Sequence, residues 1–214
     1  MITIPQLVEE FVHKSPFLEE VFSQGLINHS ALARQLKPQI DQKLYKDVQI
    51  GAIVVALNRL AIKLKPKNDT VSHILDNLGD ITLRSNITSY TFANSSTLRA
   101  KQAQLLEDIA AIPNSFVTVT DGVFETAFFV SINVASFIEK SFSAEKLKNK
   151  IDQLSSITIV IPEEAISVPG VYYSILKKLA WEGINFIEVV SSFTELTIFL
   201  ENKNVERAFS ALKH

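Results

Sequence analysis

A turn that contains Pro169 and Gly170 is the part of this sequence best suited to binding a small molecule. Glycine has no side chain, so a ligand can approach the backbone closely there. A segment with helical spacing follows, and the free N–H groups and the dipole of a helix N-terminus attract a carboxylate. Asn185 can donate and accept hydrogen bonds, which suits an amino-acid head group. The predicted ligand-binding residues are Val168, Pro169, Gly170, Val171, Asn185, Phe186, Ile187, Ser191 and Ser192.

The alternative is purely structural: Pro169 and Gly170 form only a tight turn, and Asn185 only caps a strand. Groups for catalysis do not converge anywhere in the chain. There is no cysteine, which excludes thiolate metal sites and a cysteine nucleophile. Glu163 and Glu164 are adjacent, and neighbouring residues on a strand point to opposite faces. We therefore predict no catalytic residue, no cofactor and no enzymatic activity.

Metal and phosphate sites are equally unsupported. The four histidines show no ligand spacing and are predicted to be surface or cap residues: His13, His29, His73 and His214. The six glycines, at positions 25, 51, 79, 122, 170 and 183, are too scattered to form a phosphate-binding loop. We predict no metal site and no kinase activity.

The elements that would position the turn follow from hydrophobic periodicity. Residues 156–212 alternate between a period of two and a period of about 3.6, in the order strand, helix, strand, strand, helix. Residues 80–154 show the same order: a long strand, a helix capped by Ser95 or Ser96, two strands around Asp121-Gly122, and a helix over 143–154. The chain therefore contains an internal duplication of a βαββα unit.

The second of these units resembles an ACT domain, and it is most similar to the regulatory tandem ACT domains of aspartokinases, without the kinase domain. The matching motifs are Pro169-Gly170-Val171, Gly183-Ile184-Asn185, Ser191-Ser192 and the strand 195–198. The resemblance implies a ferredoxin-like fold and amino-acid sensing. The first unit resembles an ACT domain in element order alone, because its loop 93–96 reads Ala-Asn-Ser-Ser where the second has the Pro-Gly pair.

Residues 4–65 have helical spacing throughout, and a short helix is expected over 71–78. Ser15-Pro16 is a helix start, and Pro38 is expected to kink or end a third helix. Residues 48–64 form the strongest helix, and residues 65–70 read as a linker. The predicted fold class is α+β: a helical domain over 1–79, followed by two ferredoxin-like βαββα (ACT-like) units over 80–154 and 155–214.

Charge is concentrated in residues 30–67, where eight basic and two acidic side chains give a net charge of +6 in a chain whose net charge is −2. This block is predicted to contact a polyanion or an acidic partner, unless it is simply a solvated basic face. The spacing of its helices is compatible with a helix-turn-helix pair. The alternative is a helical bundle that dimerises or docks on a protein partner. The predicted contact residues are Arg34, Lys43, Arg59, Lys63 and Lys65.

Two functions remain open from the sequence. The first is an amino-acid sensor that controls a DNA-binding helical domain, as in a transcriptional regulator. The second is a non-catalytic regulatory subunit that docks on a metabolic enzyme of amino-acid biosynthesis. In both cases a homodimer is expected, with apolar surface from Val189, Phe193, Ile198 and Leu200. No signal peptide or membrane-spanning run is apparent, so no membrane contact and a cytoplasmic location are expected.

Overall fold

The computed structural model describes residues 2–15, 18, 21–22, 25–64 and 70–213, and the chain divides into two compact units, 1–69 and 70–214. We call these the helical unit and the sheet unit. The sequence placed the division after residue 79, whereas the structure places it after residue 69. The reason is that helix α5 (Thr70–Asp76) contributes Ile74 to the core of the sheet unit. The linker was expected over 65–70; residues 65–69 lie outside the described residues, and Thr70 begins α5.

Helices α1 (Ile4–His13), α3 (His29–Leu44) and α4 (Ile50–Lys63) build the helical unit around a single apolar core. Helix α3 continues through Pro38, which the sequence predicted to kink or end it. Its buried residues, Leu32, Leu36 and Ile40, lie on both sides of the proline. Their packing maintains the helix although proline removes one backbone hydrogen bond. The helix start predicted at Ser15-Pro16 lies partly outside the described residues.

One antiparallel sheet of six strands, in the order β2-β3-β1-β4-β6-β5, forms the frame of the sheet unit. Strands β1 (Ile81–Ala93) and β4 (Leu147–Val160) are long and lie at its centre. The other strands are β2 (Val117–Asp121), β3 (Glu125–Ser131), β5 (Glu188–Ser191) and β6 (Glu195–Glu201).

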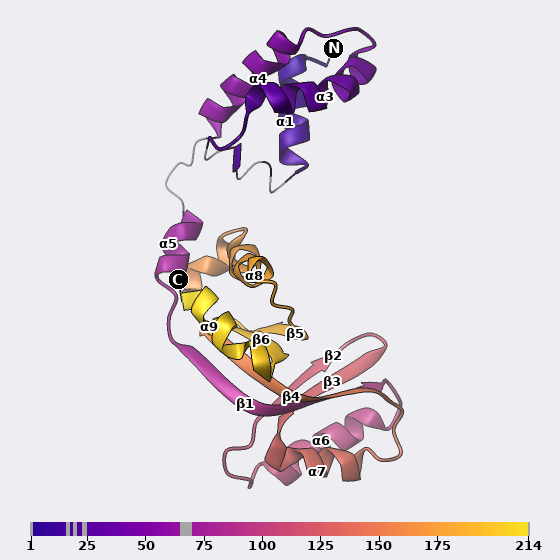
Figure 1. The fold of residues 1–214 in the computed structure, drawn as a ribbon. Coiled ribbons are helices and arrows are strands. Elements are labelled where there is room, and N and C mark those ends of the chain that lie inside the picture. The colour runs from indigo at the N-terminus through magenta and orange to yellow at the C-terminus, as the bar shows by residue number, and fades with distance from the viewer. Residues whose placement is uncertain (1, 16–17, 19–20, 23–24, 65–69, 214) are drawn as a thin grey trace. The chain divides into compact units, whose positions relative to one another are not determined.

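The sheet unit consists of two lobes that share both long strands. The inner lobe, 87–154, has the order β1-α6-β2-β3-α7-β4, with α6 (Leu98–Ile109) and α7 (Ile132–Ser141). The outer lobe joins residues 81–84 of β1 to residues 155–213. It contains α8 (Val171–Trp181), α9 (Val205–Lys213) and the short 3-10 turns Glu163–Ser167 and Asn202–Asn204. Figure 1 shows α6 and α7 on one side of the long strands and α8 and α9 on the other.

The predicted helix over 143–154 is wrong, because these residues begin strand β4, and helix α7 was not predicted. The polar run before Leu154 has few β-formers, but Ser89, Tyr90 and Thr91 of β1 pair with it. This pairing overrides the local propensity. The predicted boundary between residues 154 and 155 consequently falls inside β4. The inner lobe is inserted into the outer one, and the two do not follow each other as separate tandem units.

Both long strands change register where the lobes meet. Asn86 and Gln153 each have a φ of 59°, and the β1–β4 register shifts between Arg84 and Ile87. Phe129 of β3 and Phe199 of β6 stack there with ring centroids 4.0 Å apart. Three strand spacings separate β3 from β6, which would be about 14 Å in a flat sheet. The sheet is therefore strongly curved. The face of each lobe that carries no helix packs against the corresponding face of the other lobe, and together they form a common core.

Candidate functional site

The two lobes contain equivalent loops at the end of their central strand. In each lobe the residue after that strand donates a backbone hydrogen bond to the turn of the neighbouring hairpin, and the hairpin itself closes with one backbone bond. In the inner lobe these bonds are Asn94 N–Phe124 O and Gly122 N–Glu125 O; in the outer lobe they are Ile161 N–Thr194 O and Ser192 N–Glu195 O. The predicted duplication thus has matching hydrogen bonds, and the two loops can be compared position by position.

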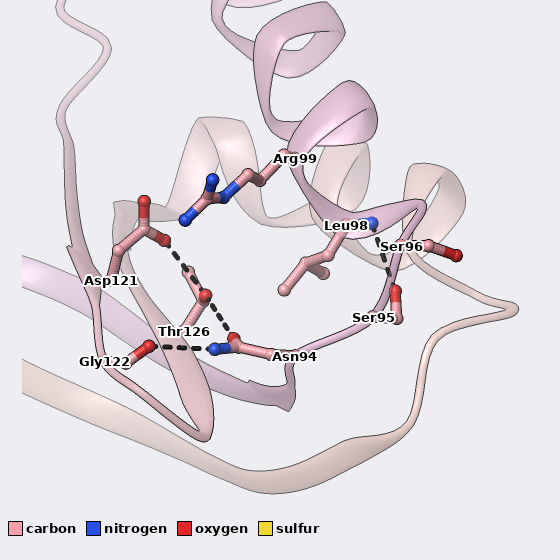
Figure 2. Close-up of a pocket in the computed structure, with 8 residues that line it drawn as sticks. All are labelled: Asn94, Ser95, Ser96, Leu98, Arg99, Asp121, Gly122 and Thr126. Atoms are coloured by element: carbon pink, nitrogen blue, oxygen red, sulfur yellow. Dashed lines mark hydrogen bonds between the residues drawn. The ribbon is translucent and has the colours of Figure 1, made fainter.

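The inner loop lines a polar pocket of about 480 Å³ between the start of α6 and the β2–β3 hairpin. Figure 2 shows its lining residues: Asn94, Ser95, Ser96, Leu98, Arg99, Asp121, Gly122 and Thr126. The hydroxyl of the buried Thr126 lies 2.8 Å from Asn94 Oδ1 and 3.0 Å from Asp121 Oδ1. The Asn94 amide donates to the Gly122 carbonyl over 2.8 Å. These bonds join the loop to the hairpin.

Two opposite charges come together in this pocket. Arg99 lies in the first turn of α6 and Asp121 ends β2, and Figure 2 shows their side chains approaching each other across one side of the pocket. Both residues are exposed, and neither forms an ion pair with another described residue. A guanidinium next to a helix N-terminus can bind a carboxylate, and a carboxylate can bind an ammonium group. The arrangement is complementary to a zwitterion.

A carboxylate behind the loop holds it in place. Glu145 lies between α7 and β4, and its side chain is 5% exposed. It accepts hydrogen bonds from the hydroxyls of Ser95 and Thr97, both over 2.7 Å, and pairs with Lys101 over 2.8 Å. These contacts, with Lys101 the largest, lower the pKa of Glu145 from its usual value of 4.5 to about 2.

This pKa predicts an acid-sensitive sheet unit. A carboxylate whose pKa is lowered by folding stabilises the protein above the unfolded value of 4.5, and the stabilisation is lost as the pH falls toward 2. We expect urea-unfolding midpoints to decrease across that window. Glu145→Met should remove part of the decrease, because the variant has no such carboxylate to protonate. An unchanged pH profile in the variant would contradict the predicted role of this contact.

The loop singled out by the sequence lies in the outer lobe. Gly170 has a φ of 93°, and the space where a side chain would begin is open. Val171 is buried, whereas Ser191 and Ser192 are exposed at the β5–β6 turn, near the end of β4. Three predicted residues lie away from this loop: Asn185, Phe186 and Ile187 precede β5, at the end of the strand opposite to Ser191. Val168 and Pro169 precede α8, and the former packs against the core. Ligand binding at this loop stays a prediction.

The position-by-position comparison separates the two loops chemically. The first residues of α6 and α8, Leu98 and Val171, are both buried, so Arg99 corresponds to Tyr172. The hairpin bonds align Asp121 with Ser191. The outer loop therefore has hydroxyls where the inner loop has a cation and an anion. The sequence interpretation missed Arg99 and Asp121, although the Ser95 cap and the Asp121-Gly122 turn were both visible.

The basic block of the helical unit is partly neutralised. Lys43 pairs with Glu10 over 2.9 Å and Lys63 with Glu9 over 2.5 Å. Hydrogen bonds from Lys14 and Lys43 lower the pKa of Glu10 to about 2. Arg34 and Arg59 are exposed and make no ion pair within the described part of the chain, and Lys65 lies outside it.

The residues expected to form a dimer surface do not share one face. Ile198 and Leu200 are fully buried in the core of the outer lobe, because alternate residues of β6 face α8 and α9. Phe193 is 67% exposed at the hairpin turn. The homodimer itself stays a prediction. No group of three or more His, Cys, Asp or Glu side chains in the described residues could hold a metal ion.

Comparison with known proteins decides the fold. No family model matches the chain, and no curated protein matches it in sequence. Solved structures do match. The regulatory subunit of aspartate kinase from Thermus thermophilus, in its ligand-free form, aligns with a TM-score of 0.51 and 17% identity over 63% of this chain and 95% of that subunit. The chain carries the fold of aspartokinase regulatory domains. The resemblance predicted from the sequence is thus confirmed at the level of fold.

Two further structures delimit the aspartokinase match. The structure of aspartokinase alpha and beta subunits aligns with a TM-score of 0.51 and 18% identity over 68% of this chain and 96% of that one. The whole aspartate kinase of Clostridium acetobutylicum aligns with a TM-score of 0.53 and 14% identity over 64% of this chain, but over only 34% of the enzyme. The neighbours therefore include isolated regulatory chains that lack the kinase domain. Within the described residues, no helix is long and apolar enough to cross a membrane.

Proposed function

We propose that this protein is a non-catalytic sensor of a free amino acid, and that the inner-lobe pocket binds the ligand. The observation that carries the proposal is the presence of Arg99 and Asp121 in one pocket at the N-terminus of α6. They are opposite in charge, and neither has an ion-pair partner in the described part of the chain. The ligand carboxylate would bind Arg99 and the first-turn N–H groups, and its ammonium group would bind Asp121.

The aspartokinase regulatory fold supports a regulatory role and the pocket supplies its chemistry. A polar pocket of about 480 Å³ has room for a small amino acid with its hydration water. The outer loop at Gly170 is the second proposed site, since its open backbone lies at a helix N-terminus. It lacks a charged pair, so we assign the primary site to the inner lobe.

A thermal-shift screen of the twenty amino acids tests the proposal. Binding to the native state alone raises the unfolding midpoint by mass action, and the shift grows with ligand concentration. We expect one amino acid or a small group of related ones to raise the midpoint, with calorimetric heat at the same concentrations. Decarboxylated and deaminated analogues of the same compound should give no shift. A chain that responds to no amino acid at millimolar concentration would not be such a sensor.

For the helical unit, the surface of α4 favours docking on a protein over reading DNA. Val55 and Ile62 are 49% and 72% exposed and lie two helical turns apart, with the exposed Arg59 between them. This mixed apolar surface is unlike the cationic face that binds phosphates, and acidic partners already neutralise Lys43 and Lys63. We therefore propose that the unit docks on a protein partner through Val55 and Ile62, with Arg59 available to an acidic group of that partner. DNA binding is the alternative.

Retention on duplex DNA separates the two. We expect none at moderate salt, and no difference between the parent and the Arg59→Ala/Lys63→Ala variant, because Glu10 and Glu9 neutralise Lys43 and Lys63. Tight retention that falls steeply with salt and is weakened by the double substitution would support DNA binding instead.

A further inference from the structure

We infer that Glu145 is the positioning residue of the inner-lobe pocket: it holds the loop 94–97 in the geometry that accepts the ligand, without contacting the ligand itself. The inference rests on the proposed function, because it assigns a role to a residue behind the proposed site. Glu145 is not among the pocket-lining residues, yet its carboxylate binds the hydroxyls of Ser95 and Thr97.

The contacts of Glu145 reach both the loop and the first turn of helix α6. One carboxylate oxygen accepts from Ser95, and the other binds both Thr97 and Lys101. The Ser95 hydroxyl in turn accepts from the backbone N–H of Leu98 over 3.1 Å, next to Arg99. The carboxylate thus determines where the loop ends and where the helix that carries the guanidinium begins. Loops without such contacts lose order easily, and ordering them costs binding free energy.

The position of Glu145 in the chain connects the pocket to the rest of the sheet unit. Its backbone N–H donates to Phe142 O over 2.8 Å, and the next residue, Lys146, accepts from Ala93 N over 2.9 Å. Strand β4 starts at Leu147 and continues into the outer lobe. The loop that Glu145 holds is therefore directly connected to the first residues of a strand that both lobes share.

Two variants test this role. Glu145→Met keeps the length of the side chain and removes all three contacts. Thr97→Val removes one of them from the loop side, at a residue outside the pocket lining. We expect Glu145→Met to weaken amino-acid binding about tenfold and Thr97→Val about threefold, because the first change removes all three contacts of the carboxylate and the second removes one. The double variant should bind no more weakly than Glu145→Met alone, because both changes break the same contact.

Glu139→Gln is the matched control. Glu139 lies on α7 of the same lobe and also holds two partners, Tyr90 over 2.9 Å and Lys150 over 3.1 Å, but it does not touch the loop. We expect this variant to bind within about twofold of the parent, since neither partner of Glu139 belongs to the loop or to the pocket lining. Equal losses of affinity in the control and in Glu145→Met would overturn the inference.

Amide hydrogen exchange without ligand separates this inference from the proposed function. Residues 94–98 should exchange faster in Glu145→Met and in Thr97→Val than in the parent and in Glu139→Gln. If the parent binds no amino acid but this exchange pattern is found, the proposed function fails and the loop-holding role stands. If the parent binds an amino acid while both variants bind it equally well with unchanged exchange, the role of Glu145 is refuted.

Discussion

Replacing either charge in the inner-lobe pocket is expected to weaken amino-acid binding roughly ten- to hundredfold, the loss that follows from a hydrogen bond to a charged group of about 1.5–3 kcal/mol. Arg99→Met removes the partner of the ligand carboxylate and leaves α6 intact, since its side chain is exposed. Asp121→Asn removes the partner of the ammonium group and keeps the oxygen that contacts Thr126. Isothermal calorimetry with the amino acid found by screening measures both.

The equivalent positions of the outer lobe supply matched controls. Tyr172→Phe and Ser191→Ala change the residues that correspond to Arg99 and Asp121, and we expect binding within about twofold of the parent because neither offers a charge. The opposite pattern, with binding lost in these controls and retained in the inner-lobe variants, would place the ligand at the Gly170 loop that the sequence predicted.

Phe129→Ala is expected to lower the free energy of unfolding of the sheet unit by about 3–5 kcal/mol, the usual cost of truncating a buried phenylalanine. Phe129 is 1% exposed and stacks on the fully buried Phe199. The core around them contains Ile87 and Leu154 from the two shared strands. One cavity should therefore destabilise both lobes together, and urea unfolding of the sheet unit should remain a single transition.

Phe124→Ala is the control for this prediction. Phe124 is 82% exposed in the turn that precedes β3, so its loss should change stability by less than about 0.5 kcal/mol. Two separate unfolding transitions within the sheet unit in Phe129→Ala, or a cost below about 1 kcal/mol, would show that the lobes do not depend on a common core.

Periodicity was sufficient to identify the elements whose own residues determine their structure. The strand–helix–strand–strand–helix order of 156–212 is confirmed, because alternate residues of β6 such as Leu196 and Ile198 are buried. Helix α8 begins after Pro169-Gly170 and ends before Gly183, as these residues predicted. Residues 147–154 could not be predicted in this way, since their strand depends on pairing with β1, far away in the sequence.

The same reason limited the prediction of the site. Pro169 and Gly170 are recognisable in isolation, so the sequence directed attention to the outer lobe. Arg99 and Asp121 are ordinary surface residues in the sequence, and they become a candidate site only when α6 and the end of β2 meet. Reading 143–154 as a helix also placed the last helix of the inner lobe too late in the chain and removed the strand that completes this lobe.

The shared strands also dictate the order in which the nascent chain can fold. Every strand of the inner lobe has left the ribosome before the outer lobe can start, and residues 81–84 must wait for residues 156–159, their partners in β4. At the usual rate of about 5–20 residues per second, this end of β1 stays unpaired for several seconds during synthesis. Ile81 and Leu83 are then exposed on a free strand edge, the kind of segment that associates with other chains. The inserted arrangement therefore leaves this strand edge without its partner for longer during synthesis than two tandem lobes would.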